Sequence, residues 1–150
     1  MADVHTPEQR SRNMSAIRSK DTKPEIFFRK LLFAEGFRYR VQEKSVPGHP
    51  DVFLRKYNVA IFIHGCFWHR HPGCKYAYTP KSQVNFWEKK FAGNLKRDAI
   101  VKDELTEQGI RQLIVWECTI RKMMKDQKTT EMIMEQTSRF LMSDLSYLEL

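Results

Sequence analysis

The chain has 150 residues, of which 26 are Lys or Arg and 18 are Asp or Glu, so its formal net charge at pH 7 is +8. This length suits one domain with a core of ordinary size, and no apolar run approaches the roughly 20 residues that a membrane span needs. The basic charge favours a polyanionic partner such as nucleic acid, and the alternative is a basic globular domain without such a partner.

The first predicted element is an N-terminal arm. Residues 6–9 match a helix start, with a capping residue, a proline and a glutamine in the expected order. The segment that follows has few apolar residues, among them Met14 and Ile17, which are too few to hold a helix in a core. We therefore expect residues 9–19 to form an arm that another surface must order.

A core helix and three strands are predicted next. The cap pattern of Thr22 and Glu25 starts the helix, and Gly36 ends it. Alternating, β-branched and aromatic residues then predict three strands, over residues 37–42, 51–54 and 58–63. The second and third of these strands are expected to form a hairpin.

The second half of the chain alternates helices with one strand. Residues 82–109 predict a long helix that is bent at Gly93, and residues 110–116 predict a strand covered on both faces. Residues 130–145 predict a closing helix. This order predicts an α/β fold, in which a mixed central sheet is flanked by helices on both faces.

Two carboxylates are candidate metal ligands. Asp51 begins one strand of the hairpin and His64 follows the other, so antiparallel pairing brings a carboxylate and an imidazole close together. Asp51 suits an oxygen ligand that holds Mg²⁺ against a phosphate, and Glu25 could add a second carboxylate. The alternatives are structural, with Asp51 as a turn former and Glu25 as part of the helix cap.

The cysteines suggest a second metal site. Cys66, His71 and Cys74 have the spacing of a chelating knuckle, and Cys118 follows the last predicted strand. Three thiolates and one imidazole make a closed tetrahedral Zn²⁺ site of the structural kind. The alternative is three reduced cysteines that act as small apolar residues. The odd number of cysteines and an N-terminus without signal-peptide features lead us to expect a cytoplasmic protein.

If His71 binds zinc, two histidines of the segment 61–74 remain for proton transfer. His69 and His64 suit a general base, provided that an acceptor orients the ring. Asp98 on the long helix is a candidate for that acceptor, and the alternative is a solvated aspartate among basic neighbours.

Aromatic residues near the same loop suggest contact with bases. Phe67 and Trp68 are expected to protrude, joined by Trp87 from the long helix. Exposed aromatics on a basic surface stack on bases or wedge between base pairs. Packing in the core is expected instead for Phe86, Phe91 and Trp116.

The run Ile-Phe-Ile-His-Gly-Cys-Phe-Trp-His at residues 61–69 resembles the very-short-patch repair mismatch endonucleases. Pro50-Asp51 before this run and Trp116-Glu117-Cys118 after it belong to the same resemblance, which reaches back to Arg12-Asn13-Met14. It implies a restriction-endonuclease-like core of helix, three strands, helix and strand. It also implies a single nuclease domain over residues 1–150, with a DNA-clamping arm (1–21), a catalytic core (22–118) and a C-terminal helical region (119–150).

The resemblance implies an activity on double-stranded DNA. Members of this family make a Mg²⁺-dependent nick 5′ to the thymine of a T·G mismatch that deamination of 5-methylcytosine leaves behind. A monomer with other DNA repair proteins as further partners, no contact with membranes and association with the nucleoid during repair are expected. The alternative from another class is a non-catalytic, zinc-stabilised protein that binds mismatched or damaged DNA.

The resemblance also implies roles for individual residues. Asp51 and the backbone carbonyl of Ile63 bind Mg²⁺, although a family member can have Thr at position 63. The catalytic set is His69 as general base supported by Asp98, His64 as phosphate-site or acid partner, and Glu25 as auxiliary acid. The DNA-binding set is the intercalating Phe67, Trp68 and Trp87, the mismatch-reading Lys90 and Asn94, and the clamping Met14 and Ile17. The spacing from His71 to Cys74 is one residue longer than in some relatives.

Overall fold

The computed structural model describes residues 21–150 of the chain. Met14, Ile17 and the rest of the predicted arm up to residue 20 lie outside the described residues. Between residues 21 and 150, no helix combines the length and the apolar character that crossing a membrane would require.

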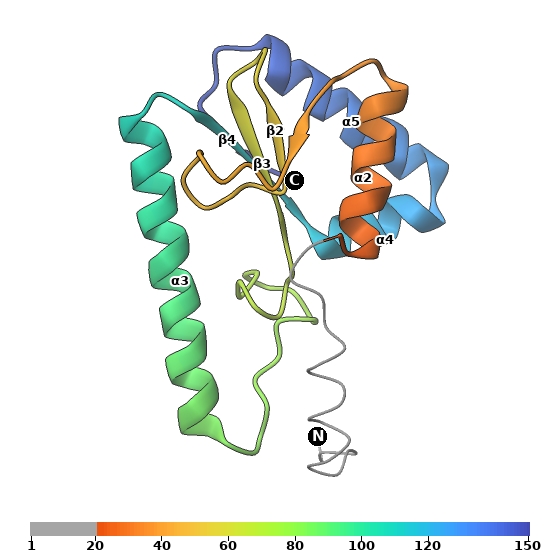
Figure 1. Cartoon of the computed structure of the whole chain (residues 1–150). Coiled ribbons are helices and arrows are strands. Elements are labelled where there is room, and N and C mark those ends of the chain that lie inside the picture. The colour runs from red at the N-terminus through yellow and green to blue at the C-terminus, as the bar shows by residue number, and fades with distance from the viewer. Residues whose placement is uncertain (1–20) are drawn as a thin grey trace.

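Residues 21–150 form a five-stranded mixed sheet with helices on both faces (Figure 1). The strands lie in the order β1-β2-β3-β4-β5. The first three pair antiparallel, and β3, β4 and β5 pair parallel. The elements are α2 (Lys23–Ala34), β1 (Arg40–Val41), β2 (Val52–Leu54), β3 (Val59–His64), α3 (Val84–Glu107), β4 (Arg111–Trp116), α4 (Glu117–Lys125), α5 (Gln127–Met142) and β5 (Tyr147–Glu149).

The sheet separates two hydrophobic cores. Along β4, Leu113 and Val115 face the helices α2, α4 and α5, whereas Ile114 and Trp116 face α3. Both sets are buried, which explains why the sequence of β4 is apolar without alternation. The larger core also contains Phe28 and Leu32 of α2, Ile120 and Met123 of α4, and Ile133, Met134, Phe140 and Leu141 of α5. The sheet is therefore covered on both faces, as the sequence predicts.

Local signals explain the ends of two helices. The hydroxyl of Thr22 accepts a hydrogen bond from the Glu25 amide, so Thr22 caps α2 as predicted. The Glu25 carboxylate does not close the predicted capping box on Thr22, because it accepts from the amide of Asp21 at 2.8 Å. Gly36 and Gly109 follow α2 and α3 with positive φ, the conformation of a glycine C-cap.

The α/β fold is confirmed, and several boundaries differ from the prediction. The strand expected at 37–42 is only Arg40–Val41, and α3 runs through Gly93 as one continuous helix. The closing helix expected at 130–145 is α5, which is preceded by α4 and followed by β5. The region at 119–150 thus contains most of α4, all of α5 and the short strand β5. No turn residue separates β4 from α4, and β5 is too short to show alternation.

Candidate functional site

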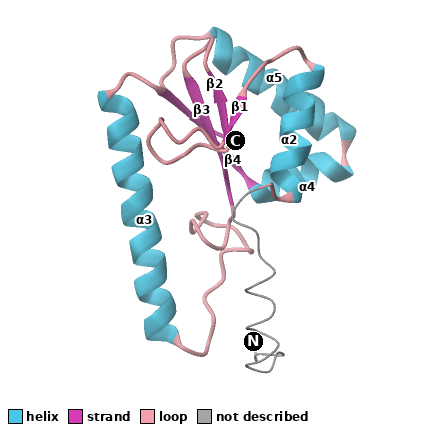
Figure 2. Cartoon of the chain, in the orientation of Figure 1, coloured by secondary structure: helices cyan, strands magenta, loops and turns pink. Residues whose placement is uncertain are grey.

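A cavity of about 550 Å³ lies between the sheet and α3, at the edge where β2 begins and β3 ends. Figure 2 shows the long loop that leaves β3 at this edge and leads to α3. The cavity is lined by seven of the residues singled out from the sequence, which are Glu25, Asp51, Ile63, His64, His69, Asn94 and Asp98. The fold thus brings side chains from α2, β3, α3 and two loops into one space.

Asp51 is held rigidly in this cavity. Its Oδ2 accepts a hydrogen bond from the amide of Ile63 at 2.7 Å, and its Oδ1 accepts from the Gln42 side chain at 3.4 Å. Burial raises the pKa of the Asp51 carboxyl. The role of Gln42 was not predicted, because nothing in the sequence links it to Asp51.

Glu25 is the second carboxyl of the cavity and is only 4 % exposed. Burial, followed by the negative charge of Asp51, raises the pKa of Glu25 to about 7. Both carboxyls resist ionisation because they are buried, and their negative charges repel each other. A divalent cation bound between them would neutralise these charges. The carboxyl pair therefore fits Mg²⁺, and the part of the Ile63 carbonyl in such a site stays a prediction.

The two histidines and Asp98 form one connected group. His69 Nδ1 lies 2.7 Å from Asp98 Oδ2, and the His69 ring is stacked on His64 with centroids 3.8 Å apart and an interplanar angle of 4°. Burial, followed by the charge of His69, lowers the pKa of His64 to about 3. His64 is therefore uncharged at neutral pH. Asp98 contacts His69 directly, so the alternative of a merely solvated aspartate is wrong.

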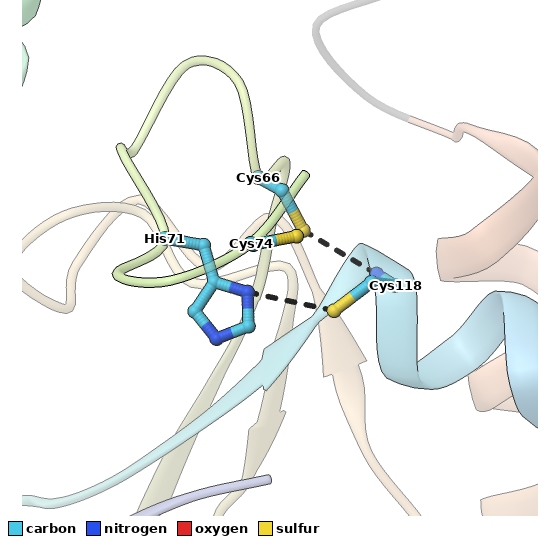
Figure 3. Close-up of side chains that lie close together, drawn as sticks. All are labelled: Cys66, His71, Cys74 and Cys118. Atoms are coloured by element: carbon cyan, nitrogen blue, oxygen red, sulfur yellow. Dashed lines mark hydrogen bonds between the residues drawn. The ribbon is translucent and has the colours of Figure 1, made fainter. Parts of the chain in front are cut away.

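Cys66, His71, Cys74 and Cys118 converge as Figure 3 shows, with the first three on the loop after β3 and Cys118 in the first turn of α4. Their ligand atoms all lie within 4.8 Å of one another. A tetrahedral ion with Zn–S bonds of about 2.3 Å holds its sulfurs about 3.8 Å apart, so the donor set fits zinc. Burial raises the pKa of the Cys66 thiol to about 12, and metal binding would release that proton.

The C-terminal strand supports this Cys/His cluster. The ring of His71 is stacked on Trp116, with centroids 4.1 Å apart and an interplanar angle of 8°. The indole of Trp116 donates to Glu149 Oε1 at 2.9 Å, and Tyr147 donates to Glu149 Oε2 at 2.8 Å. These supporting contacts were missed from the sequence, because β5 was not predicted.

Four rings form an aromatic cluster beside the cavity, and we use this name for Phe67, Trp68, Trp87 and Phe91. Phe67 is central, with its ring centroid 5.1 to 5.4 Å from the other three. Phe67 and Trp68 are half-buried against these neighbours, so the expected protrusion holds only in part. Phe91 is buried as expected, and the predicted burial of Phe86 is wrong because its side chain is 57 % exposed.

The predicted mismatch readers lie on α3. Lys90 is exposed, whereas Asn94 is only 8 % exposed and donates its side-chain amide to the carbonyl of Trp68 at 3.0 Å. Asn94 therefore fixes the backbone of the aromatic cluster, and its contact with a mismatch stays a prediction. Arg97 and Lys102, which sequence reasoning missed, also line the cavity and give it a basic border suited to phosphate.

Comparisons with known proteins identify the family of the chain. A sequence model described as DNA mismatch endonuclease Vsr matches residues 2–75. The type II nicking enzyme V.NmeAIP of Neisseria meningitidis is 45 % identical over 121 residues, which are 81 % of this chain and 86 % of the relative. The DNA mismatch endonuclease Vsr of Escherichia coli K12 is 42 % identical over 137 residues, 90 % of this chain and 87 % of the relative. With these identities over most of its length, the chain belongs to the Vsr family of DNA mismatch endonucleases.

Proposed function

We propose that this DNA endonuclease of the repair class nicks duplex DNA 5′ to the thymine of a T·G mismatch, and thereby starts very-short-patch repair of deaminated 5-methylcytosine. The observation that carries the proposal is the meeting of Asp51, Glu25 and the His69–Asp98 pair in one cavity. A protein that only binds mismatched DNA has no need of a carboxyl pair beside an oriented imidazole. The names of the relatives, mismatch endonuclease and nicking enzyme, point to the same class of reaction.

Asp51, the carbonyl of Ile63 and Glu25 would hold Mg²⁺, which when bound neutralises charge on the scissile phosphate and on the leaving oxygen. His69 acts as the general base. Because its Nδ1 is engaged by Asp98, its Nε2 is the nitrogen that takes a proton from the attacking water.

We assign His64 the role of phosphate-site partner. Its pKa of about 3 leaves the ring uncharged at neutral pH, so it has no imidazolium proton to donate as an acid. The ring is also stacked on His69, and it therefore restricts the plane in which the base can lie.

The Cys/His cluster is proposed to bind a structural Zn²⁺. Cys66 and His71 flank His69 in sequence, and Cys118 ties the same loop to α4. A metal at this place would brace the backbone of the loop after β3, which carries His69, and this role suits a closed site without an open coordination position.

We propose that DNA is bound by the aromatic residues, by the mismatch readers on α3 and by the N-terminal arm. Phe67, Trp68 and Trp87 lie beside the cavity, where partly exposed rings could insert at the mismatch. The protein is proposed to act as a cytoplasmic monomer, together with other repair proteins. The residues of this set are Phe67, Trp68, Trp87, Lys90, Asn94, Met14 and Ile17.

The test is a nicking assay with Asp51→Asn on duplexes that differ only in one T·G or C·G pair, with and without Mg²⁺. We expect wild type to nick the T·G duplex only with Mg²⁺, and Asp51→Asn to bind this duplex but nick it at least about a hundredfold more slowly. Asp144→Asn, at an exposed aspartate outside the cavity, is the matched control and should behave as wild type.

Three results would each contradict a different part of the proposal. Equal nicking by wild type and Asp51→Asn would refute the catalytic assignment of this carboxylate. Equal nicking of both duplexes would refute mismatch specificity. Tight T·G binding without nicking under any metal condition would favour the non-catalytic alternative.

A further inference from the structure

Arg70 is a charged residue for which the proposed mechanism has no role, although it lies between His69 and His71. We infer that Arg70 is a positioning residue, which fastens residues 77–79 to the aromatic cluster and makes Tyr78 a further ring of the DNA-contacting surface. The inference rests on the proposed function, because it requires that the aromatic cluster meets DNA.

The guanidinium of Arg70 is used almost completely within the protein. Its Nη1 donates to the carbonyls of Phe67 at 3.2 Å and of Tyr78 at 2.9 Å. Its Nη2 donates to the carbonyl of Ala77 at 2.9 Å and to the hydroxyl of Thr79 at 3.1 Å. The four N–H groups of the two Nη atoms therefore all have partners in the chain, which is not the arrangement of an arginine kept free for phosphate.

The same guanidinium packs on the aromatic cluster. Its central carbon lies 3.8 Å from the centre of the Phe91 ring, a close cation–π contact. Arg70 thus joins three parts of the molecule, which are the loop after β3, helix α3 and the segment 77–79 that leads towards α3 (Figure 1).

Tyr78 is the exposed side chain that this arrangement holds in place. It is 58 % exposed, and its ring is tilted by 43° against Phe67 with centroids 5.1 Å apart. The segment 77–79 has no helix or strand of its own, so its order depends on contacts such as those of Arg70. A ring held beside Phe67 before binding loses less conformational freedom when it meets DNA.

The ring of Tyr78 would stack on the face of a base or a sugar next to the mismatch. Ring stacking on nucleic acid tolerates any base, and the loss of one stacked ring weakens binding about tenfold. A lysine at position 70 would keep the charge but could not bond several carbonyls in one plane, so it would not replace the arginine.

The experiment measures affinity for T·G and C·G duplexes by fluorescence anisotropy, with zinc content and thermal melting as checks of the fold. The variants are Arg70→Ala, Arg70→Lys, Tyr78→Ala, Tyr78→Phe and the double change of Arg70 and Tyr78 to Ala. Trp68→Ala serves as the reference for the aromatic cluster. Arg139→Ala is the matched control, since Arg139 is an exposed arginine of α5 that pairs only with Glu135 among the described residues.

We expect Arg70→Ala, Arg70→Lys and Tyr78→Ala each to weaken T·G binding about five- to tenfold, with Tyr78→Phe within twofold of wild type. Zinc content and C·G binding should stay unchanged. The double variant should bind no more weakly than Arg70→Ala, because both changes remove the same placed ring. A purely structural role of Arg70 would not produce this non-additivity.

Other results would overturn the inference. Wild-type affinity of Arg70→Lys would identify a direct charge contact, and fully additive losses would show that Arg70 does not act through Tyr78. If Arg70→Ala does not fold, the T·G affinities of Arg70→Lys, Tyr78→Ala and Tyr78→Phe still test the inference. Loss of T·G binding with Trp68→Ala but not with Tyr78→Ala overturns this inference alone, whereas wild-type binding by Trp68→Ala overturns the proposed DNA-contacting cluster as well.

Discussion

The pKa of Glu25 predicts how the stability of the metal-free protein depends on pH. The folded protein holds this carboxyl at a pKa of about 7, against 4.5 for an unperturbed glutamate, so folding favours the protonated form. The stabilisation is fully present below pH 4.5 and is lost as the pH rises through about 7. At 1.36 kcal/mol per pKa unit, wild type loses about 3 kcal/mol of stability over this range because of Glu25 alone.

Glu25→Gln removes this dependence and keeps an oxygen to accept from the Asp21 amide. Between pH 5 and pH 8 the variant should gain about 2 to 3 kcal/mol relative to wild type, or roughly 5 to 10 °C in Tm for a chain of this size. The assay is thermal melting at both pH values without Mg²⁺, with Glu135→Gln, an exposed glutamate of α5, as the control.

Adding Mg²⁺ should raise the Tm of wild type more at pH 8 than at pH 5, because the ion would stabilise the ionised carboxyls of Glu25 and Asp51. The reasoning would be refuted by a Glu25→Gln variant whose advantage over wild type is the same at both pH values. A larger advantage at pH 5 would show that the sign is wrong.

Three further predictions follow from the contacts around the cavity and the Cys/His cluster. Asp98→Asn should slow single-turnover nicking about 10- to 100-fold through loss of a charge-assisted hydrogen bond to His69, with T·G affinity within twofold of wild type; an unchanged rate would remove Asp98 from the mechanism. Cys118→Ser should lower zinc content, measured by metal analysis, and reduce Tm by at least about 5 °C, and full zinc content would reject Cys118 as a ligand. Glu149→Ala should weaken zinc binding about tenfold in a chelator competition, with Glu149→Gln intermediate, because the support for Trp116 and His71 is lost; equal affinities would contradict this.

The parts of the site that were predictable from the sequence depend on local chemistry. Thr22 and Gly36 signal the ends of α2 by their side-chain and backbone properties, which act within a few residues. The spacing of Cys66, His71 and Cys74 is typical of a chelating loop, so these candidate ligands could be named without a structure. The position of Asp51 next to the end of β3 was also predictable, because the short turn between β2 and β3 fixes how the two strands pair.

The parts that could not be predicted depend on contacts between distant residues. The hydrogen-bond partners of Arg70 lie up to nine residues away in a loop without periodicity, and Glu149 reaches Trp116 across 33 positions through an unpredicted strand. Burial at the start of α3 was misjudged for a related reason. Trp87 and Phe91 are one helical turn apart and both contact Phe67 of the loop after β3, whereas Phe86 is rotated away from this loop towards solvent.

The backbone around His69 connects the Cys/His cluster to the cavity that holds Asp51 and Glu25. The amide of His69 donates to the carbonyl of Gly65 and the amide of His71 donates to that of Cys66, so His69 lies within a tight turn between two zinc-ligand candidates. Its side chain is held from the other direction by Asp98 on α3. Because the turn is short and both of its ends are fixed, a displacement of His71 would move the ring of His69 away from Asp98 and His64. A metal ion in the Cys/His cluster would therefore help to orient the proposed base as well as stabilise the fold, although the cluster contributes no ligand to the cavity itself.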